Sequence, residues 1–292
     1  MKRYRILAYD FDSRATNLKI EIQEDWEEHI KEQWKLTQES IKEGLIAEYG
    51  AIGAFKKINN FIELDANPIS IIAFHNKFLR QVRSAYVVGS YYAALTGACA
   101  LGERILNHLI LRLRDCHKGT DEYKKVYRKD SFDNWDLGIN TLEAWEVLLP
   151  NVVKSFWELK EIRNKSIHFN PETDSNDKEL SLEAISKLKE VVAGQFSGFG
   201  TQPWFIEGIK GACYIKSEFE EKPFVKEIVI TNCVKVGHLH TLEHGHNGWV
   251  VHDSHDYAKI EISDERFAEL MNNPRQYDAH NNKIQPTAES GG

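Results

Sequence analysis

The hydrophobic and polar positions of this chain follow two different periods, and the change falls near residue 200. Before that point, apolar residues recur at steps of three, four and seven, which is typical of helices with one buried face. After it, the apolar runs are short and bounded by polar residues, which is typical of strands. The pattern predicts an α+β protein that is mainly helical and ends in a small β domain.

The N-terminal segment, residues 1–69, is predicted to combine strands with helices. Residues 5–12 and 18–22 alternate apolar and polar side chains, which predicts two strands joined in a hairpin. Apolar residues then recur at steps of four and seven up to the pair Asn67-Pro68, which interrupts the helical pattern. The helices predicted here span residues 24–49 and 51–63.

The central segment, residues 70–198, is predicted to be a helical bundle. Pro150 and Asn170-Pro171 interrupt its helical pattern, because the residue before a proline avoids the α conformation. Ser181 is predicted to cap the last helix at its N-terminus. The predicted helices span residues 70–83, 85–115, 138–149, 151–167 and 181–193.

A stripe of small residues runs along the longest of these predicted helices. Gly89, Ala93 and Gly97 follow one another at steps of four. Glycine inside a helix costs about 1 kcal/mol relative to alanine, so the stripe indicates the close approach of another helix. We therefore expect the central helices to form a homodimer with two-fold symmetry.

The stretch 194–200 is rich in glycine and predicts a domain boundary. Beyond it we expect a small β domain over residues 203–265 and a disordered polar tail over residues 273–292, which lacks core-forming side chains. The strands predicted in this part span residues 212–216, 225–231, 234–236, 248–252 and 258–262.

Composition and charge exclude several classes of protein to which the chain could belong. The 292 residues are 42% hydrophobic, enough for a sizeable core, and the net charge of −7 argues against a basic surface that coats DNA non-specifically. The four cysteines form no CxxC pair, which argues against a cysteine-based zinc site. The apolar run over residues 6–9 is too short for a signal peptide, and residues 85–101 carry too many polar side chains for a membrane span. We expect a cytoplasmic protein that has reduced thiols and no membrane segment.

One cluster of residues at the end of the helix predicted over 151–167 has the means to cleave RNA. Arg163 carries a fixed charge and a planar fork that suits phosphate, and His168 can accept or donate a proton near neutral pH. Arg163 and His168 project about 140° apart on an unbroken helix, so they converge only where the helix ends. On spacing alone, the pair also fits a surface arginine and a histidine favoured at a helix C-terminus.

The helical context adds to this motif. Arg163-Asn164 followed by His168 resembles the Arg-x4-6-His signature of the HEPN-domain family, and the segment 101–106 resembles the acidic-polar patch of the same family. The resemblance covers about residues 70–198 and implies a HEPN-like bundle, a homodimer and metal-independent RNA cleavage without a cofactor. It implies that Arg163 and His168 are the catalytic pair, with Asn164 as a polar companion and Glu103 as a further site residue.

Two other groups of residues have alternative explanations. Asp10 and Asp12 fit either a metal or phosphotransfer site or the polar face of a strand. Six histidines lie between residues 238 and 255, where pairs at period two fit either a metal site or an exposed hairpin. The residues of the alternative metal site are His238, His240, His244 and His246.

The sequence therefore predicts a metal-independent endoribonuclease of HEPN type that binds RNA as a homodimer, and the resemblance implies a role in antiviral or toxin-like defence. The alternative is a catalytically inactive HEPN-like dimer that binds RNA or a partner protein. The acidic charge favours the binding protein, whereas the presence of both Arg163 and His168 favours the enzyme.

Overall fold

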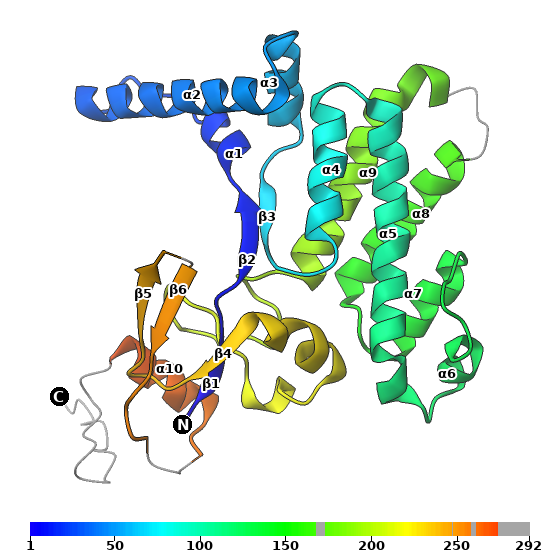
Figure 1. The fold of residues 1–292 in the computed structure, drawn as a ribbon, viewed down its shortest axis with the longest axis vertical. Helices are drawn as coiled ribbons and strands as arrows, with labels where there is room; N and C mark the ends of the chain where they lie inside the picture. Colours follow the sequence, from blue (N-terminus) through cyan, green and yellow to red (C-terminus); the bar gives the residue numbers. More distant parts are fainter. Residues whose placement is uncertain (168–172, 247, 258–260, 274–292) are drawn as a thin grey trace, which may run out of the picture. The chain divides into compact units, whose positions relative to one another are not determined.

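The structure is a computed structural model that describes residues 1–167, 173–246, 248–257 and 261–273. Within these ranges it is mainly helical with small two-stranded sheets, so the predicted α+β class is confirmed (Figure 1). The helices are α1 (Arg14–Lys19), α2 (Glu28–Tyr49), α3 (Ala54–Glu63), α4 (Asn76–Val87), α5 (Tyr91–Leu113), α6 (Asp121–Val126), α7 (Trp135–Ala144), α8 (Pro150–Ile167), α9 (Thr173–Gln195) and α10 (Asp264–Asn272). The strands are β1 (Arg3–Ile6), β2 (Tyr9–Asp12), β3 (Asn67–Ile71), β4 (Cys233–Val236), β5 (Thr241–Gly245) and β6 (Gly248–His252).

The chain divides into two units. One unit is continuous and spans Asp10–Ser197, and the other joins Met1–Tyr9 to Gly198–Gly292. The division falls inside the glycine-rich stretch 194–200, where the sequence predicts a boundary. The N-terminal residues 1–69, expected to form a segment of their own, are divided between the two units.

Helix α5 forms the centre of the helical unit. It contacts α4, α7, α8 and α9, and α8 also packs along α9. Five of its leucines are buried, which is why this helix is apolar on more than one side. They are Leu95, Leu101, Leu106, Leu109 and Leu113.

Two glycines allow helices to approach α5 closely. A Cβ atom at Gly102 would lie 2.7 Å from Cδ2 of Leu159 in α8 and 2.7 Å from Cη2 of Trp135 in α7. A Cβ at Gly97 would lie 3.0 Å from Cγ2 of Val82 in α4. Both glycines therefore serve packing within one chain, and Gly102 sets how closely α7 and α8 approach α5.

Replacement of Gly102 by alanine should lower the free energy of unfolding by about 1–3 kcal/mol, because the added methyl group overpacks the core against a rigid indole ring. Gly44 is the matched control, since it lies in α2 and a Cβ atom there would have nothing within 4 Å. Gly44→Ala should raise stability by about 0.5–1 kcal/mol through helix propensity. Urea unfolding followed by circular dichroism measures both changes, and equal shifts in the two variants would contradict the packing argument.

The single helix predicted over residues 85–115 is wrong in its first turn. α4 ends at Val87, Gly89 adopts a φ of +86°, and α5 begins at Tyr91. That backbone conformation favours glycine and stops a helix. Gly89 therefore lies in a turn and shares no helical stripe with Ala93 and Gly97, which removes the packing argument that the stripe offered for a homodimer.

The hairpin predicted from strands 5–12 and 18–22 is also wrong. Residues 3–6 and 9–12 form β1 and β2, but residues 14–19 form helix α1. Gln38 of α2 donates its amide N–H to the carbonyl oxygens of Asn17 and Ile20 at 3.1 and 2.8 Å, which satisfies the end of α1. A short apolar run fits the period of a strand as well as that of a helix, and here the helix packs on α2 and α3.

The helix predicted over residues 70–83 begins later, because residues 67–71 form β3 beside β2. The backbone N–H of Ile71 donates to the Phe196 carbonyl at 2.8 Å, and the side chain of Asn76 accepts from the Ala73 N–H at 2.7 Å.

The prediction that Ser181 caps a helix is also wrong. Ser181 lies inside α9, where its hydroxyl donates to the Lys178 carbonyl at 2.8 Å.

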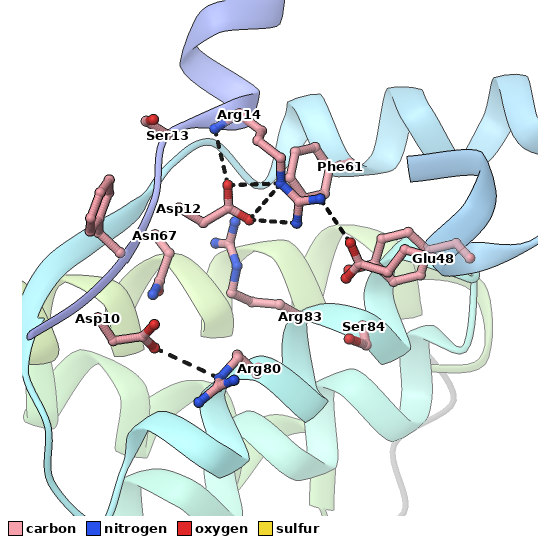
Figure 2. Close-up of a pocket in the computed structure, with 12 residues that line it drawn as sticks. Asp10, Asp12, Ser13, Arg14, Glu48, Phe61, Asn67, Arg80, Arg83 and Ser84 are labelled. Atoms are coloured by element: carbon pink, nitrogen blue, oxygen red, sulfur yellow. Dashed lines mark hydrogen bonds and ion pairs between the residues drawn. The ribbon is translucent and has the colours of Figure 1, made fainter. Parts of the chain in front are cut away.

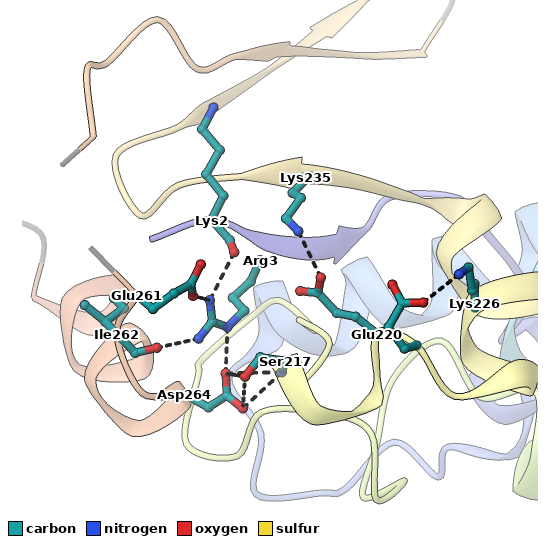
Figure 3. A network of polar contacts seen from close by, with 10 residues as sticks. Lys2, Arg3, Ser217, Glu220, Lys226, Lys235, Glu261, Ile262 and Asp264 are labelled. Carbon is teal, nitrogen blue, oxygen red and sulfur yellow. Dashed lines mark hydrogen bonds and ion pairs between the residues drawn. The ribbon is translucent and has the colours of Figure 1, made fainter. Parts of the chain in front are cut away.

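The second unit is held together by strands from both ends of the chain. β1 pairs with β4 in antiparallel register, with Arg3 opposite Val236, and β5 pairs with β6 in a hairpin. Arg3 is only 2% exposed, and its guanidinium donates to Asp264 at 2.6 Å and to the Ile262 carbonyl at 2.6 Å (Figure 3). These bonds satisfy a charge that would be costly to bury alone.

Several strands predicted in this unit are absent from its described residues. Residues 225–229 form a π-helix and residues 230–232 a 3-10 helix in place of a strand, and residues 212–216 make only isolated bridges. The strands at 234–236 and 248–252 are confirmed as parts of β4 and β6. α10, capped by Ser263, was not predicted. Residues 258–260 and the predicted tail from 274 onward lie outside the described residues.

No helix in the described ranges combines the length and the apolar character needed to cross a membrane.

Candidate functional site

A cavity of about 480 Å³ lies between the start of α7 and the C-terminal half of α8. It contains two of the residues predicted from the motif, Arg163 and Asn164. The residues that line it are Asp133, Asn134, Trp135, Asp136, Lys160, Arg163 and Asn164.

Helix α8 places three polar side chains on the wall of this cavity. Lys160, Arg163 and Asn164 are spaced at i, i+3 and i+4, so they share one face of the helix. The Arg163 guanidinium donates to Oδ1 of Asn164 at 3.3 Å, and both side chains are accessible to solvent. The wall therefore combines an arginine fork with a neighbouring amide, a pair suited to phosphate oxygens.

The opposite wall is the beginning of α7. Asn134 caps this helix by accepting the N–H of Leu137 at 3.0 Å. Trp135 is buried, and its indole N–H donates to Oε2 of Glu103 at 3.2 Å. Glu103 does not line the cavity. It positions Trp135 through this hydrogen bond.

The charges of the cavity are mixed. Lys160 forms an ion pair with Asp136 at 2.8 Å and lies over the Trp157 ring at 4.9 Å. Arg163 forms no ion pair among the described residues, and it lines the same cavity as Asp133 and Asp136. Arg163 is therefore the cation best placed to receive an anion there.

The charge of Arg163 also acts on the helix behind the cavity. Burial raises the pKa of the Cys99 thiol to about 11, while a hydrogen bond with Ser166 and the Arg163 charge oppose this rise. Cys99 is only 2% exposed and stays protonated at neutral pH, so it is not a candidate nucleophile. Ser166 also donates its hydroxyl to the Ile162 carbonyl at 2.7 Å.

One side of α5 carries four polar residues, Glu103, Arg104, Asn107 and His108. They contact two different parts of the helical unit. On one side, Glu103 contacts Trp135, and Asn107 holds the loop before α7 through the Phe132 backbone at 2.6 and 2.7 Å. On the other side, Arg104 lies over the Phe78 ring of α4 at 4.6 Å and His108 stacks on Phe74 at 4.5 Å. This side of α5 thus has packing partners along its length.

Part of this cavity was not predicted from the sequence. The predicted residue His168 lies outside the described residues. Lys160 was missed although its spacing from Arg163 places both on one helix face. Asp133 and Asp136 were missed because only the packing of α7 on α8 brings them to the motif.

The alternative metal site does not form as the histidine spacing suggests. His238 and His240 are buried in the turn after β4, where His240 bonds to the Gly237 carbonyl at 2.6 Å. His244 lies in β5 against Trp249, and His246 follows the end of that strand. Over the described ranges, no three His, Cys, Asp or Glu side chains gather so that they could hold a metal ion.

The acidic pair Asp10 and Asp12 lies in β2 and lines a different cavity.

Comparison of the chain with protein-family models, with curated proteins and with solved structures gives no match.

Proposed function

We propose that this protein is a metal-independent endoribonuclease of HEPN type, in which Arg163 and Asn164 bind the scissile phosphate and His168 transfers protons. One observation carries the proposal: Arg163 and Asn164 line an open cavity together with Lys160, on the last turns of α8, directly before His168 in the sequence. The resemblance of the motif to the HEPN signature supplies the reaction class.

The proposed chemistry uses the 2′-hydroxyl of the RNA itself. His168 takes the proton of this hydroxyl as its oxygen attacks the adjacent phosphorus, and the 5′-oxygen of the next nucleotide leaves and takes up a proton. Arg163 stabilises the negative charge that grows on the phosphate oxygens. The products are a 2′,3′-cyclic phosphate and a free 5′-hydroxyl.

A second candidate is a protein of the same fold that binds RNA or a partner protein without cleavage. The observation in its favour is the Lys160–Asp136 ion pair, together with Asp133, because these carboxylates offset the positive charge of the cavity. Such a site would bind phosphate more weakly than a purely basic one.

The deciding experiment offers the purified protein a labelled single-stranded RNA and the DNA of the same sequence. We expect cleavage of the RNA alone, with 2′,3′-cyclic phosphate ends identified by mass spectrometry, and we expect cleavage to persist in excess EDTA. Cleavage of the DNA would exclude attack by the 2′-hydroxyl. Binding of RNA without any cleavage would favour the second candidate.

The proposal includes a homodimer in which two copies of the motif face one cleft, as the resemblance implies. Light scattering at micromolar protein concentration should give twice the chain mass of 33.7 kDa. A monomer mass over the whole concentration range of the cleavage assay would contradict this part of the proposal.

A further inference from the structure

A second cavity, of about 490 Å³, lies in the helical unit beside β2 and β3 (Figure 2). Its walls come from the end of β2, the start of α1, the end of α2, and from α3 and α4. Its lining includes Asp10, Phe11, Asp12, Arg14, Glu48, Asn67, Arg80 and Arg83.

One part of this cavity is a closed ion-pair network. Arg14 donates to both carboxylate oxygens of Asp12, at 3.1 and 2.9 Å, and to Glu48 at 2.8 Å (Figure 2). Burial alone would raise the pKa of Asp12, but the hydrogen bonds from Arg14 hold this pKa below its usual value. Both oxygens of Asp12 thus accept hydrogen bonds from Arg14, so this carboxylate is held in the ion pair.

Other polar atoms in this cavity, including one of Arg83 beside Asp12, have no hydrogen-bond partner among the described residues. Arg83 and Asn67 are each 6% exposed. Within the described ranges, Nη1 of Arg83, Oδ1 of Asn67 and Oδ2 of Asp10 are buried and have no hydrogen-bond partner, although Oδ2 of Asp10 forms a long ion pair with Arg80. Nη2 of Arg83 donates to the Asp65 carbonyl at 2.7 Å, which fixes the guanidinium in place. Buried polar groups are normally paired, so three such atoms in one cavity mark a binding site.

These atoms define what a ligand must present. Arg83 offers an N–H and needs an acceptor, whereas Asp10 and Asn67 offer oxygens and need donors. A guanine base carries this pattern, since its carbonyl oxygen lies beside two N–H groups that can bond a carboxylate. Adenine presents no such pair of donors next to an acceptor carbonyl.

The rim of the cavity fits the rest of a nucleotide. Arg80 is 70% exposed at its side chain and its Nε lies 3.7 Å from Oδ2 of Asp10. Its guanidinium can receive a phosphate from solvent. Phe11 also lines the cavity and is 52% exposed, which leaves much of its ring accessible to a base.

We infer that this cavity binds a guanine mononucleotide unit, with the base at Arg83, Asp10 and Asn67 and the phosphate at Arg80. The unit comes either from free GMP or from a guanosine within single-stranded RNA. The site is separate from the Arg163 cavity, so the inference does not depend on RNA cleavage.

Isothermal titration of the full-length protein with GMP, guanosine, AMP and inorganic phosphate tests this assignment. We expect GMP to bind at least tenfold more tightly than AMP, and we expect phosphate alone to give no measurable heat. Absence of GMP binding at concentrations up to ~1 mM, or equal binding of AMP, would overturn it.

Two variants and a control test the residues. Asp10→Asn should weaken GMP binding by roughly ten- to a hundredfold, the loss typical of a hydrogen bond to a charged group. Arg80→Gln should make GMP bind no better than guanosine, and the exposed position of Arg80 leaves the packing of the core unchanged. The matched control Asp115→Asn, at an exposed carboxylate outside the cavity, should bind GMP as the parent does. Unchanged GMP binding in a folded Asp10→Asn variant, or, if that variant fails to fold, in Arg80→Gln, would overturn the inference.

A final experiment distinguishes free GMP from a guanosine within single-stranded RNA as the ligand. A short 2′-O-methyl oligonucleotide with a single guanosine cannot undergo attack by its own 2′-oxygen. If it competes with GMP and its binding is lost with Asp10→Asn, the site binds guanosine within RNA. If only GMP binds, the site is for the free nucleotide, and both results support the guanine assignment.

Discussion

Replacement of Arg163 by alanine should lower the rate of RNA cleavage about 10²- to 10³-fold, the usual loss when a donor that stabilises transition-state charge is removed. His168→Ala should lower it about 10²- to 10⁴-fold, because proton transfer at the 2′-hydroxyl is then left to water. Both groups act on one transition state, so the double variant should lose much less than the product of the two single losses. Single-turnover cleavage of a labelled RNA measures all three rates.

Matched controls separate chemistry from charge and folding. Arg128→Ala removes an exposed arginine outside the cavity and should leave the rate unchanged. Lys154→Ala removes an exposed cation from α8 itself, outside the cavity, and should also leave it unchanged. If Arg163→Ala and His168→Ala cut RNA at the parental rate while remaining folded, the site assignment is wrong.

Acid should destabilise the helical unit through His75. This side chain is fully buried beside Phe196, and burial lowers its pKa from 6.5 to about 3. Below pH 6.5 the unfolded chain therefore takes up a proton that the folded chain does not, and the free energy of unfolding falls as pH falls toward 3. At pH 4.5, two pH units below the unfolded value, this one group should cost roughly 2–3 kcal/mol.

The test compares the parent with His75→Phe and His75→Gln, whose side chains cannot take up that proton. Urea unfolding at pH 7.5, 5.5 and 4.5 should show a smaller loss of stability in both variants, while all other titrating groups cancel in the difference. His29→Gln, which changes a histidine that is 70% exposed at its side chain, should leave the pH dependence as in the parent. Parallel curves for parent and His75 variants would contradict the prediction.

The helices with a full apolar stripe were predictable from the sequence. α2 and α8 lie where the spacing of apolar residues places them, and Pro150 marks the start of α8 as expected for a residue without a backbone N–H. α7 was predicted over 138–149 but begins at Trp135 and ends at Ala144. Short elements were not predictable in the same way. Residues 14–19 were predicted as a hairpin turn and the start of a strand, but they form a helix that packs on α2 and α3.

The candidate site shows the same limit. The motif identifies Arg163 and Asn164 because it is local, and their spacing from Lys160 is local too. The carboxylates Asp133 and Asp136 reach the cavity only through the packing of α7 on α8. A short sequence motif contains no information about that packing. The cavity beside β2 depends even more on distant segments, since Asp10 and Arg83 meet there from a strand and a helix far apart in the sequence.

The pairing of β1 with β4 has a consequence for synthesis of the protein on the ribosome. Arg3 is synthesised 261 positions before its partner Asp264. At about 5–20 residues per second, the delay is on the order of ten to fifty seconds. During this interval the continuous helical unit, residues 10–197, is complete while β1 still lacks β4. The edge of β1 therefore stays unpaired until β4 has been synthesised.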